Sequence, residues 1–85
     1  MSASSKGAKA AIQEIVDNQL KDNTPPETKE TYQRLLNQGF SKAEARELIG
    51  AVVSSEIFEV VKEQRQYDQK RFIAALHKLP KMPWE

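Results

Sequence analysis

The sequence predicts an all-α fold, a compact four-helix domain with a long central third helix. Twice, at residues 24–27 and 41–44, a Thr or Ser is followed three residues later by Glu. This is the spacing of a capping box, in which each side chain satisfies a backbone N–H of the other residue. A third helix start is expected at Asp68, where Tyr67 can pack on Phe72 as a hydrophobic staple. The three starts divide the 85 residues into four segments, and none of them has the alternating pattern of a strand.

The first helix is expected from about Ala8 to Lys21, because its apolar residues recur at intervals of three and four. Residues 1–7 are small and polar and are expected to be disordered. The Pro25-Pro26 pair ends the helix, since proline lacks an N–H and keeps its predecessor out of helical geometry. The apolar stripe consists of Ala8, Ala11, Ile12, Ile15, Val16, Gln19 and Leu20.

The second helix is expected from about Pro25 to Gln38, with Thr24 as its N-cap. Pro25 then takes the first helical position, where a missing N–H costs nothing. Gly39 is the expected left-handed residue that ends the helix. The inner face is only modestly apolar and consists of Tyr32, Leu35 and Leu36.

The third helix is expected from the Ser41 cap to Glu63 and is the longest and most apolar segment. The β-branched run at residues 49–53 is compatible with a strand. Length, helical period and an acidic face expected to be solvated, Glu56/Glu59/Glu63, favour a helix instead. The apolar positions are Ala45, Leu48, Ile49, Val52, Val53, Ile57, Val60 and Val61, with Phe58 to one side.

The fourth helix is expected from about Gln69 to Leu79, and Pro80 stops it. Its predicted buried residues are Phe72, Ile73, Leu76 and Leu79. The predicted organisation is therefore a disordered N-terminus at 1–7, one helical domain at 8–79 and a C-terminal tail at 80–85.

Composition excludes several classes of protein. With no cysteine and one histidine, disulfides, thiolate metal sites and His-rich cages are excluded. The 13 basic and 12 acidic residues are interspersed, so the clustered cations that nucleic-acid binding needs are missing and nucleic acid is a disfavoured partner. No apolar run can span a membrane and the polar N-terminus is unlike a secretory signal, so a cytoplasmic protein with no membrane partner is the default expectation.

The residues predict no catalytic, cofactor-binding or metal site, and we expect a protein that is not an enzyme. The only imidazole, His77, is expected at the surface rather than acting as a general base. Glu44 and Glu47 share a helix face, as do Glu56 and Glu59, but the capping box uses Glu44 and the second pair belongs to the solvated face. The three glycines are isolated, so no phosphate-binding loop is present.

Three aromatic residues are the candidate partner contacts: Phe40, Phe58 and Trp84. The link at residues 37–41 could be the turn of a helix-turn-helix or the Gly-Phe loop of a ubiquitin-associated-type module. A glycine cap with Phe40 in the core is the preferred interpretation. Trp84 is either a lid folded over the bundle or an anchor for a partner, and the flanking prolines favour the lid.

Short motifs along nearly the whole chain carry a resemblance. They are Glu14–Leu20, Pro25-Pro26-Glu27, Arg34-Leu35-Leu36, Gly39-Phe40-Ser41, Glu44-Ala45, Ile49-Gly50, Tyr67-Asp68, Arg71-Phe72 and Leu76. In order and spacing the chain resembles a family of small bacterial all-helical domains of unknown function. The resemblance implies a metal site made of two His pairs, each spaced four apart, on the first and third helices. Those positions hold Lys9, Gln13, Ala43 and Glu47, so the resemblance implies that the site is absent here.

The leading hypothesis is a non-enzymatic interaction or structural module whose partner is an unknown protein or a second copy of the chain. A long apolar face on a chain near the lower size limit for a stable core favours self-association. Two alternatives remain open. One is a metal-binding domain of the resembled family with a degenerate site, and the other is a helix-turn-helix nucleic-acid binder.

Overall fold

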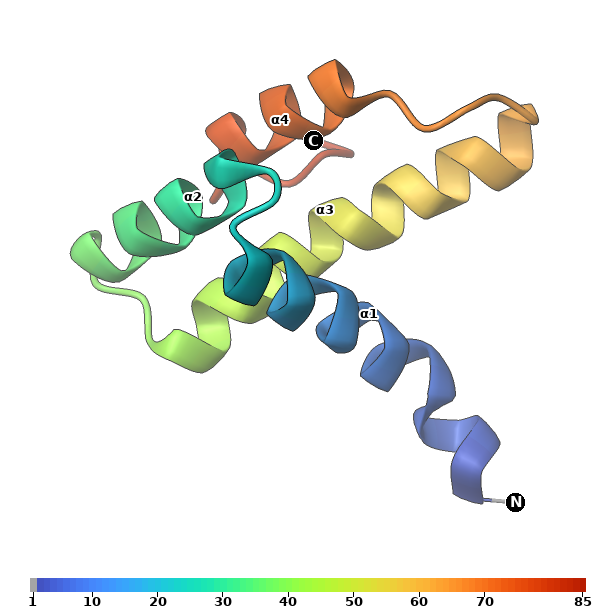
Figure 1. Ribbon diagram of the computed structural model, residues 1–85, viewed down its shortest axis with the longest axis horizontal. Coiled ribbons are helices and arrows are strands. Elements are labelled where there is room, and N and C mark those ends of the chain that lie inside the picture. Colours follow the sequence, from blue (N-terminus) through green and yellow to red (C-terminus); the bar gives the residue numbers. More distant parts are fainter. Residues whose placement is uncertain (1) are drawn as a thin grey trace.

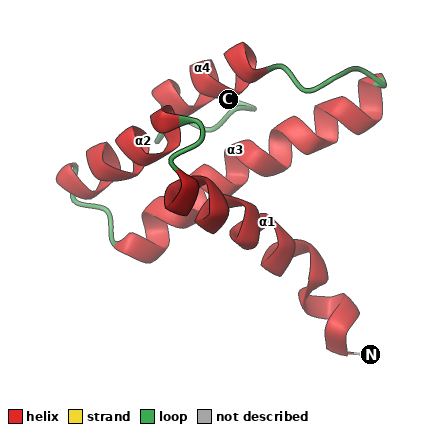
Figure 2. Ribbon diagram, viewed as in Figure 1, coloured by secondary structure: helices red, strands yellow, loops and turns green. Residues whose placement is uncertain are grey.

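The computed structural model describes residues 2–85, with side chains from Gly7 onward. Four helices form a compact all-α domain (Figure 1 and Figure 2): α1 Ser2–Asp22, α2 Pro26–Asn37, α3 Lys42–Glu63 and α4 Gln69–Lys78. At 22 residues α3 is the longest, and it packs against each of the other three helices. The predicted fold class and central third helix are confirmed.

The N-terminal ends of α3 and α4 form as predicted. The Ser41 hydroxyl accepts from the Glu44 N–H at 3.0 Å, and the Ser41 N–H donates to the Glu44 carboxylate at 2.8 Å, which completes the capping box. Asp68 caps α4 by accepting from the N–H groups two and three residues on. The Tyr67 and Phe72 ring centroids lie 6.1 Å apart, so the predicted staple is also present.

The predicted Thr24 cap of α2 is wrong. The cap residue is Pro25, with no side-chain hydrogen bond, and the helix begins at Pro26. Pro25 contributes its carbonyl, which accepts from the Thr28 N–H at 3.1 Å, while the Thr24 hydroxyl donates back to the Asp22 carbonyl at 3.0 Å. Either proline can occupy the first helical position. The helix begins at Pro26 and not at Pro25, so the residue at the cap position is Pro25 and not Thr24.

The N-terminal boundary also differs from the prediction. The structure continues α1 back to Ser2, whereas a start near Ala8 after a disordered segment at 1–7 was expected. Met1 lies outside the described residues. Residues 2–6 include no proline and so nothing that breaks a helix.

The core is built around α3. Helix α1 crosses it at Gly50, where an added Cβ would lie 2.7 Å from the Gln13 side-chain nitrogen and 3.3 Å from an Ile12 methyl carbon. The missing side chain therefore allows the close approach of the two helices. The buried apolar residues are Val16, Leu35, Ala45, Ile49, Val52, Val53, Phe72, Leu76 and Leu79.

Polar groups of α2 complete the packing. Thr28 and Thr31 are buried alongside Leu35, and the Thr28 hydroxyl donates to the Gln19 side-chain carbonyl at 2.9 Å. Tyr32, which was predicted to belong to the inner face, is only half-buried, as is Leu36. The Arg34 guanidinium donates to the carbonyls of Leu76 and Leu79, at 3.1 and 2.8 Å, and so satisfies acceptors at the end of α4.

Within residues 2–85, none of the helices combines the length and the apolar character needed to cross a lipid bilayer.

Candidate functional site

Two of the three predicted partner contacts lie beside each other on the outside of the bundle. Phe58, in the C-terminal half of α3, is 60% exposed, and Trp84, in the tail, is 69% exposed. Both line one hollow, together with Ser54, Ser55, Glu59 and Pro83. The structure therefore brings together Phe58 of α3 and Trp84 of the tail, which the α3–α4 link and α4 separate in the sequence.

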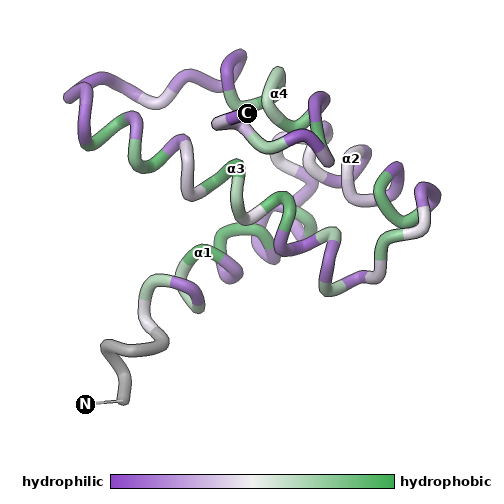
Figure 3. The backbone as a smooth tube through the Cα atoms, turned by 180° about the vertical axis from the view of Figure 1, so that it is seen from behind, coloured by the Kyte–Doolittle hydropathy of each residue, from purple (hydrophilic) through white to green (hydrophobic). Residues whose placement is uncertain are grey.

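The tail at 80–85 folds back onto the bundle, but the predicted tryptophan lid is wrong. Met82 and Pro83 are half-buried, and Met82 lies near Phe40 and Leu48. The indole of Trp84 nevertheless stays in solvent. The prolines turn the chain back as expected, yet the covering contacts are made by the residues before Trp84. Figure 3, which views the molecule from behind, shows the C-terminal end beside α4 and α3.

Phe40 does not join this surface. It is half-buried and packs against the core after Gly39, which ends α2 with a φ of 101°. Its N–H donates to the Leu35 carbonyl at 3.1 Å, as in a glycine-terminated helix end. The preferred interpretation of Phe40, a residue tucked against the core, is confirmed.

Two further apolar residues of α3 extend the exposed surface. Ile57 is 42% exposed and Val61 is 71% exposed, although both were counted with the apolar face of the helix. They continue the side of α3 on which α1 crosses at Gly50, because residues 50, 54, 57 and 61 follow one another at intervals of three and four. Ile57, Phe58, Val61 and Trp84 are called the α3–tail patch below.

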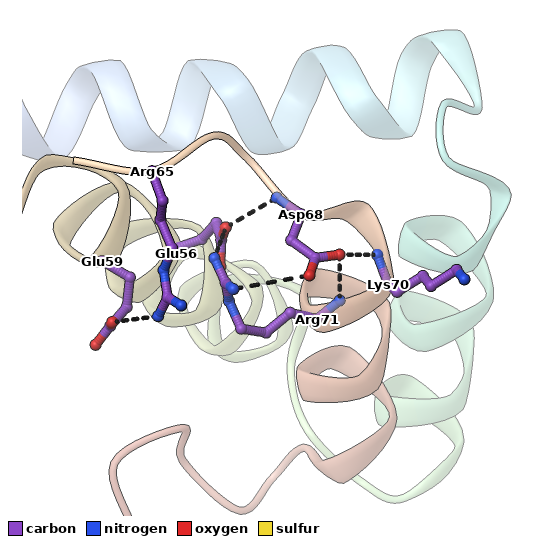
Figure 4. A network of polar contacts seen from close by, with 6 residues as sticks. All are labelled: Glu56, Glu59, Arg65, Asp68, Lys70 and Arg71. Carbon is purple, nitrogen blue, oxygen red and sulfur yellow. Dashed lines mark hydrogen bonds and ion pairs between the residues drawn. The ribbon is translucent and has the colours of Figure 1, made fainter. Parts of the chain in front are cut away.

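The acidic face of α3 is partly buried, contrary to the prediction that it is solvated. Glu56 is only 7% exposed. Its carboxylate accepts from Arg71 Nε at 3.0 Å and Nη2 at 2.6 Å, and from the Asp68 N–H at 3.3 Å (Figure 4). Glu59 pairs with Arg65 at 3.1 Å nearer to solvent. A single sequence could not indicate this, because the cation comes from the next helix.

This network also sets the ionisation of its neighbours. The hydrogen bond to Glu56 raises the pKa of Arg71, which stays charged. Partial burial, followed by the nearby charges of Glu56 and Asp68, raises the pKa of the Tyr67 phenol above its ordinary value. Both groups belong to or border a polar cluster that attaches the α3–α4 link to α3. In this cluster the charge of Arg71 is already paired with that of Glu56.

The other residues considered for chemistry are exposed or already engaged in local contacts. His77 is exposed on α4. Glu44 is used by the capping box, and the Glu47 carboxylate lies 4.0 Å from Lys9 Nζ, with both side chains largely in solvent.

The positions that the resemblance assigns to paired histidines are largely brought together. Lys9, Gln13 and Glu47 line one hollow between α1 and α3, while Ala43 is exposed one turn earlier on α3. Gln13 is occupied, since its side-chain nitrogen donates to the Arg46 carbonyl at 3.3 Å. In the part of the chain that the structure describes, no three His, Asp or Glu side chains converge as a metal ion would need.

No protein-family model, curated protein or solved structure matches this chain. The resemblance to the histidine-paired family therefore stays a prediction.

Proposed function

We propose that this chain is a non-enzymatic interaction module that binds a protein partner through the α3–tail patch. The observation that carries the proposal is the exposure of Ile57, Phe58, Val61 and Trp84, from 42% to 71%, in a domain that already has a closed core. Scattered exposed apolar residues are normal, but an aromatic pair that lines one hollow is typical of a binding surface.

The surroundings of the patch support this use. Lys62 lies with its ammonium 5.5 Å from the centre of the Phe58 ring, and the Glu59–Arg65 pair lies along the rim. Protein interfaces commonly have an aromatic centre inside a polar, charged rim, and tryptophan is enriched among the residues that contribute most affinity.

The two alternatives have less support. For nucleic-acid binding, the basic residues at the start of α3 are offset, since Arg46 is paired with Asp17 at 2.7 Å and Glu44 and Glu47 lie beside them. For metal binding, Glu47 is the only metal ligand type at the four positions that the resemblance names.

The test is retention of partners by the purified, tagged chain from an extract of its native cells. Phe58→Glu should abolish retention of at least one protein that the wild type retains. An untagged copy of the chain counts as such a protein. Gln33→Glu, which adds the same charge to the exposed side of α2, should retain it. Both variants should keep the helical circular dichroism of the parent. If wild type and Phe58→Glu retain the same proteins, the patch is not a binding surface and the proposal fails.

A further inference from the structure

The outward face of α3 lies opposite the core and is bordered by the tail residues Met82, Pro83 and Trp84. It has a charge pattern that complements itself. Acidic residues lie towards its N-terminal end, a basic residue lies towards its C-terminal end, and small residues and one aromatic lie between them. These residues recur at helical spacing and are exposed or half-buried: Glu44, Glu47, Ala51, Ser54, Ser55, Phe58 and Lys62.

This pattern favours one way of pairing two copies. In a parallel pair each Glu47 would face Glu47 of the second copy, which is repulsive. In an antiparallel pair Glu47 can face Lys62 of the second copy. The midpoint between Glu47 and Lys62 in sequence falls between Ser54 and Ser55, and so does the midpoint between Ala51 and Phe58. One register therefore pairs the opposite charges and places each Phe58 ring over the small Ala51 at the same time.

We propose that the partner of the α3–tail patch is a second copy of this chain, bound through an antiparallel α3–α3 contact. Its two-fold axis passes between Ser54 and Ser55. This inference rests on the proposed function and names the partner for it. The interface is isologous, with two Glu47–Lys62 ion pairs and two Phe58–Ala51 contacts.

The same register accounts for the exposed Ile57 and Val61. Helix α1 crosses α3 at Gly50, and the two-fold brings Gly50 of one copy to the level of Glu59 of the other along the helix pair. Ile57 and Val61 flank Glu59 along the chain and lie on the α1 side of the helix. In the dimer they therefore lie beside α1 of the second copy, which covers them. One helix pair bordered by this contact is still a small interface, so we expect a dimer of micromolar rather than nanomolar affinity.

The test reverses the charges and measures the dissociation constant by sedimentation equilibrium. Glu47→Lys and Lys62→Glu should each weaken the homodimer roughly tenfold or more, because each creates two like-charge contacts per dimer. The double variant should regain most of the affinity. An equimolar mixture of the two single variants should form a heterodimer more tightly than either variant alone, because both cross-contacts then pair opposite charges.

Cysteine cross-linking gives a second, independent measurement. The chain has no cysteine. Ser54→Cys lies at the two-fold and should form a disulfide-linked dimer under mild oxidation, whereas Gln33→Cys, exposed on α2, should stay monomeric. A strict monomer at all concentrations, a dimer insensitive to both charge reversals, or equal cross-linking of the two cysteine variants would each overturn the inference. If Phe58→Glu still abolishes retention of a different protein, the proposed function survives that failure.

Discussion

Replacing Glu56 with alanine is expected to lower the free energy of unfolding by about 2 kcal/mol, although the sequence pattern places this residue on a solvated face. The side chain is 7% exposed and accepts three hydrogen bonds, two from Arg71 and one from the Asp68 N–H. Its loss frees the link between α3 and α4 and leaves a small void above Val52 and Phe72, which line the same hollow.

The magnitude follows from the unequal burial of the two partners. Hydrogen bonds to charged groups contribute roughly 1.5–3 kcal/mol each when they are well buried. The Arg71 side chain is 33% exposed, so it can turn to water and recover part of that energy. The net loss therefore corresponds to about one such hydrogen bond, or about 2 kcal/mol of the free energy of unfolding. In a domain of this size, that loss lowers the melting midpoint by roughly 8–16 °C.

The assay is urea unfolding followed by circular dichroism at constant m-value, with Glu59→Ala as the matched control. Glu59 pairs with Arg65, but their side chains are 37% and 49% exposed, so its replacement should cost less than about 0.5 kcal/mol. Glu56→Gln should fall between the two, because the amide keeps the volume and one acceptor. If Glu56→Ala and Glu59→Ala are equally mild, the assignment of Glu56 as a buried anchor is refuted.

Three further predictions follow from the observed contacts. Ser41→Ala should cost about 0.5–2 kcal/mol in urea unfolding because a complete capping box is lost, whereas Thr24→Ala, at a position that caps nothing, should cost clearly less. The raised pKa of Tyr67 contributes stability that is complete below about pH 10 and is lost as the pH rises through the folded-state value. Tyr67→Phe should therefore flatten the alkaline fall of the melting midpoint, and an unchanged slope would contradict this. Trp84→Ala should leave the melting midpoint within about 2 °C of wild type, because the indole is 69% exposed; a large fall would mean that the tail packs as a lid after all.

Local signals determined the helices, because their causes lie within a few residues of one another. The box at Ser41 and the staple of Tyr67 on Phe72 are contacts at three and five residues' separation, and both form as predicted. After Thr24, Pro25 and Pro26 both suit the first helical position. The prediction chose Pro25 and so placed the start of α2 one residue early. The period of apolar residues likewise placed α3 at the centre of the bundle.

The sequence by itself therefore determined the number and order of the helices, most of their ends and which helix is central, since short-range hydrogen bonds and helical period decide these features. Only the tertiary structure decided how far along each helix its neighbours cover it. Glu56 is buried because Arg71 approaches from α4, and Ile57 and Val61 are exposed because α1 leaves α3 beyond Gly50. Likewise Phe58 and Trp84 meet only because the tail folds back along α3. These contacts join residues far apart in the chain, and an amphipathic pattern tells where a helix is apolar but not how far its neighbours reach along it.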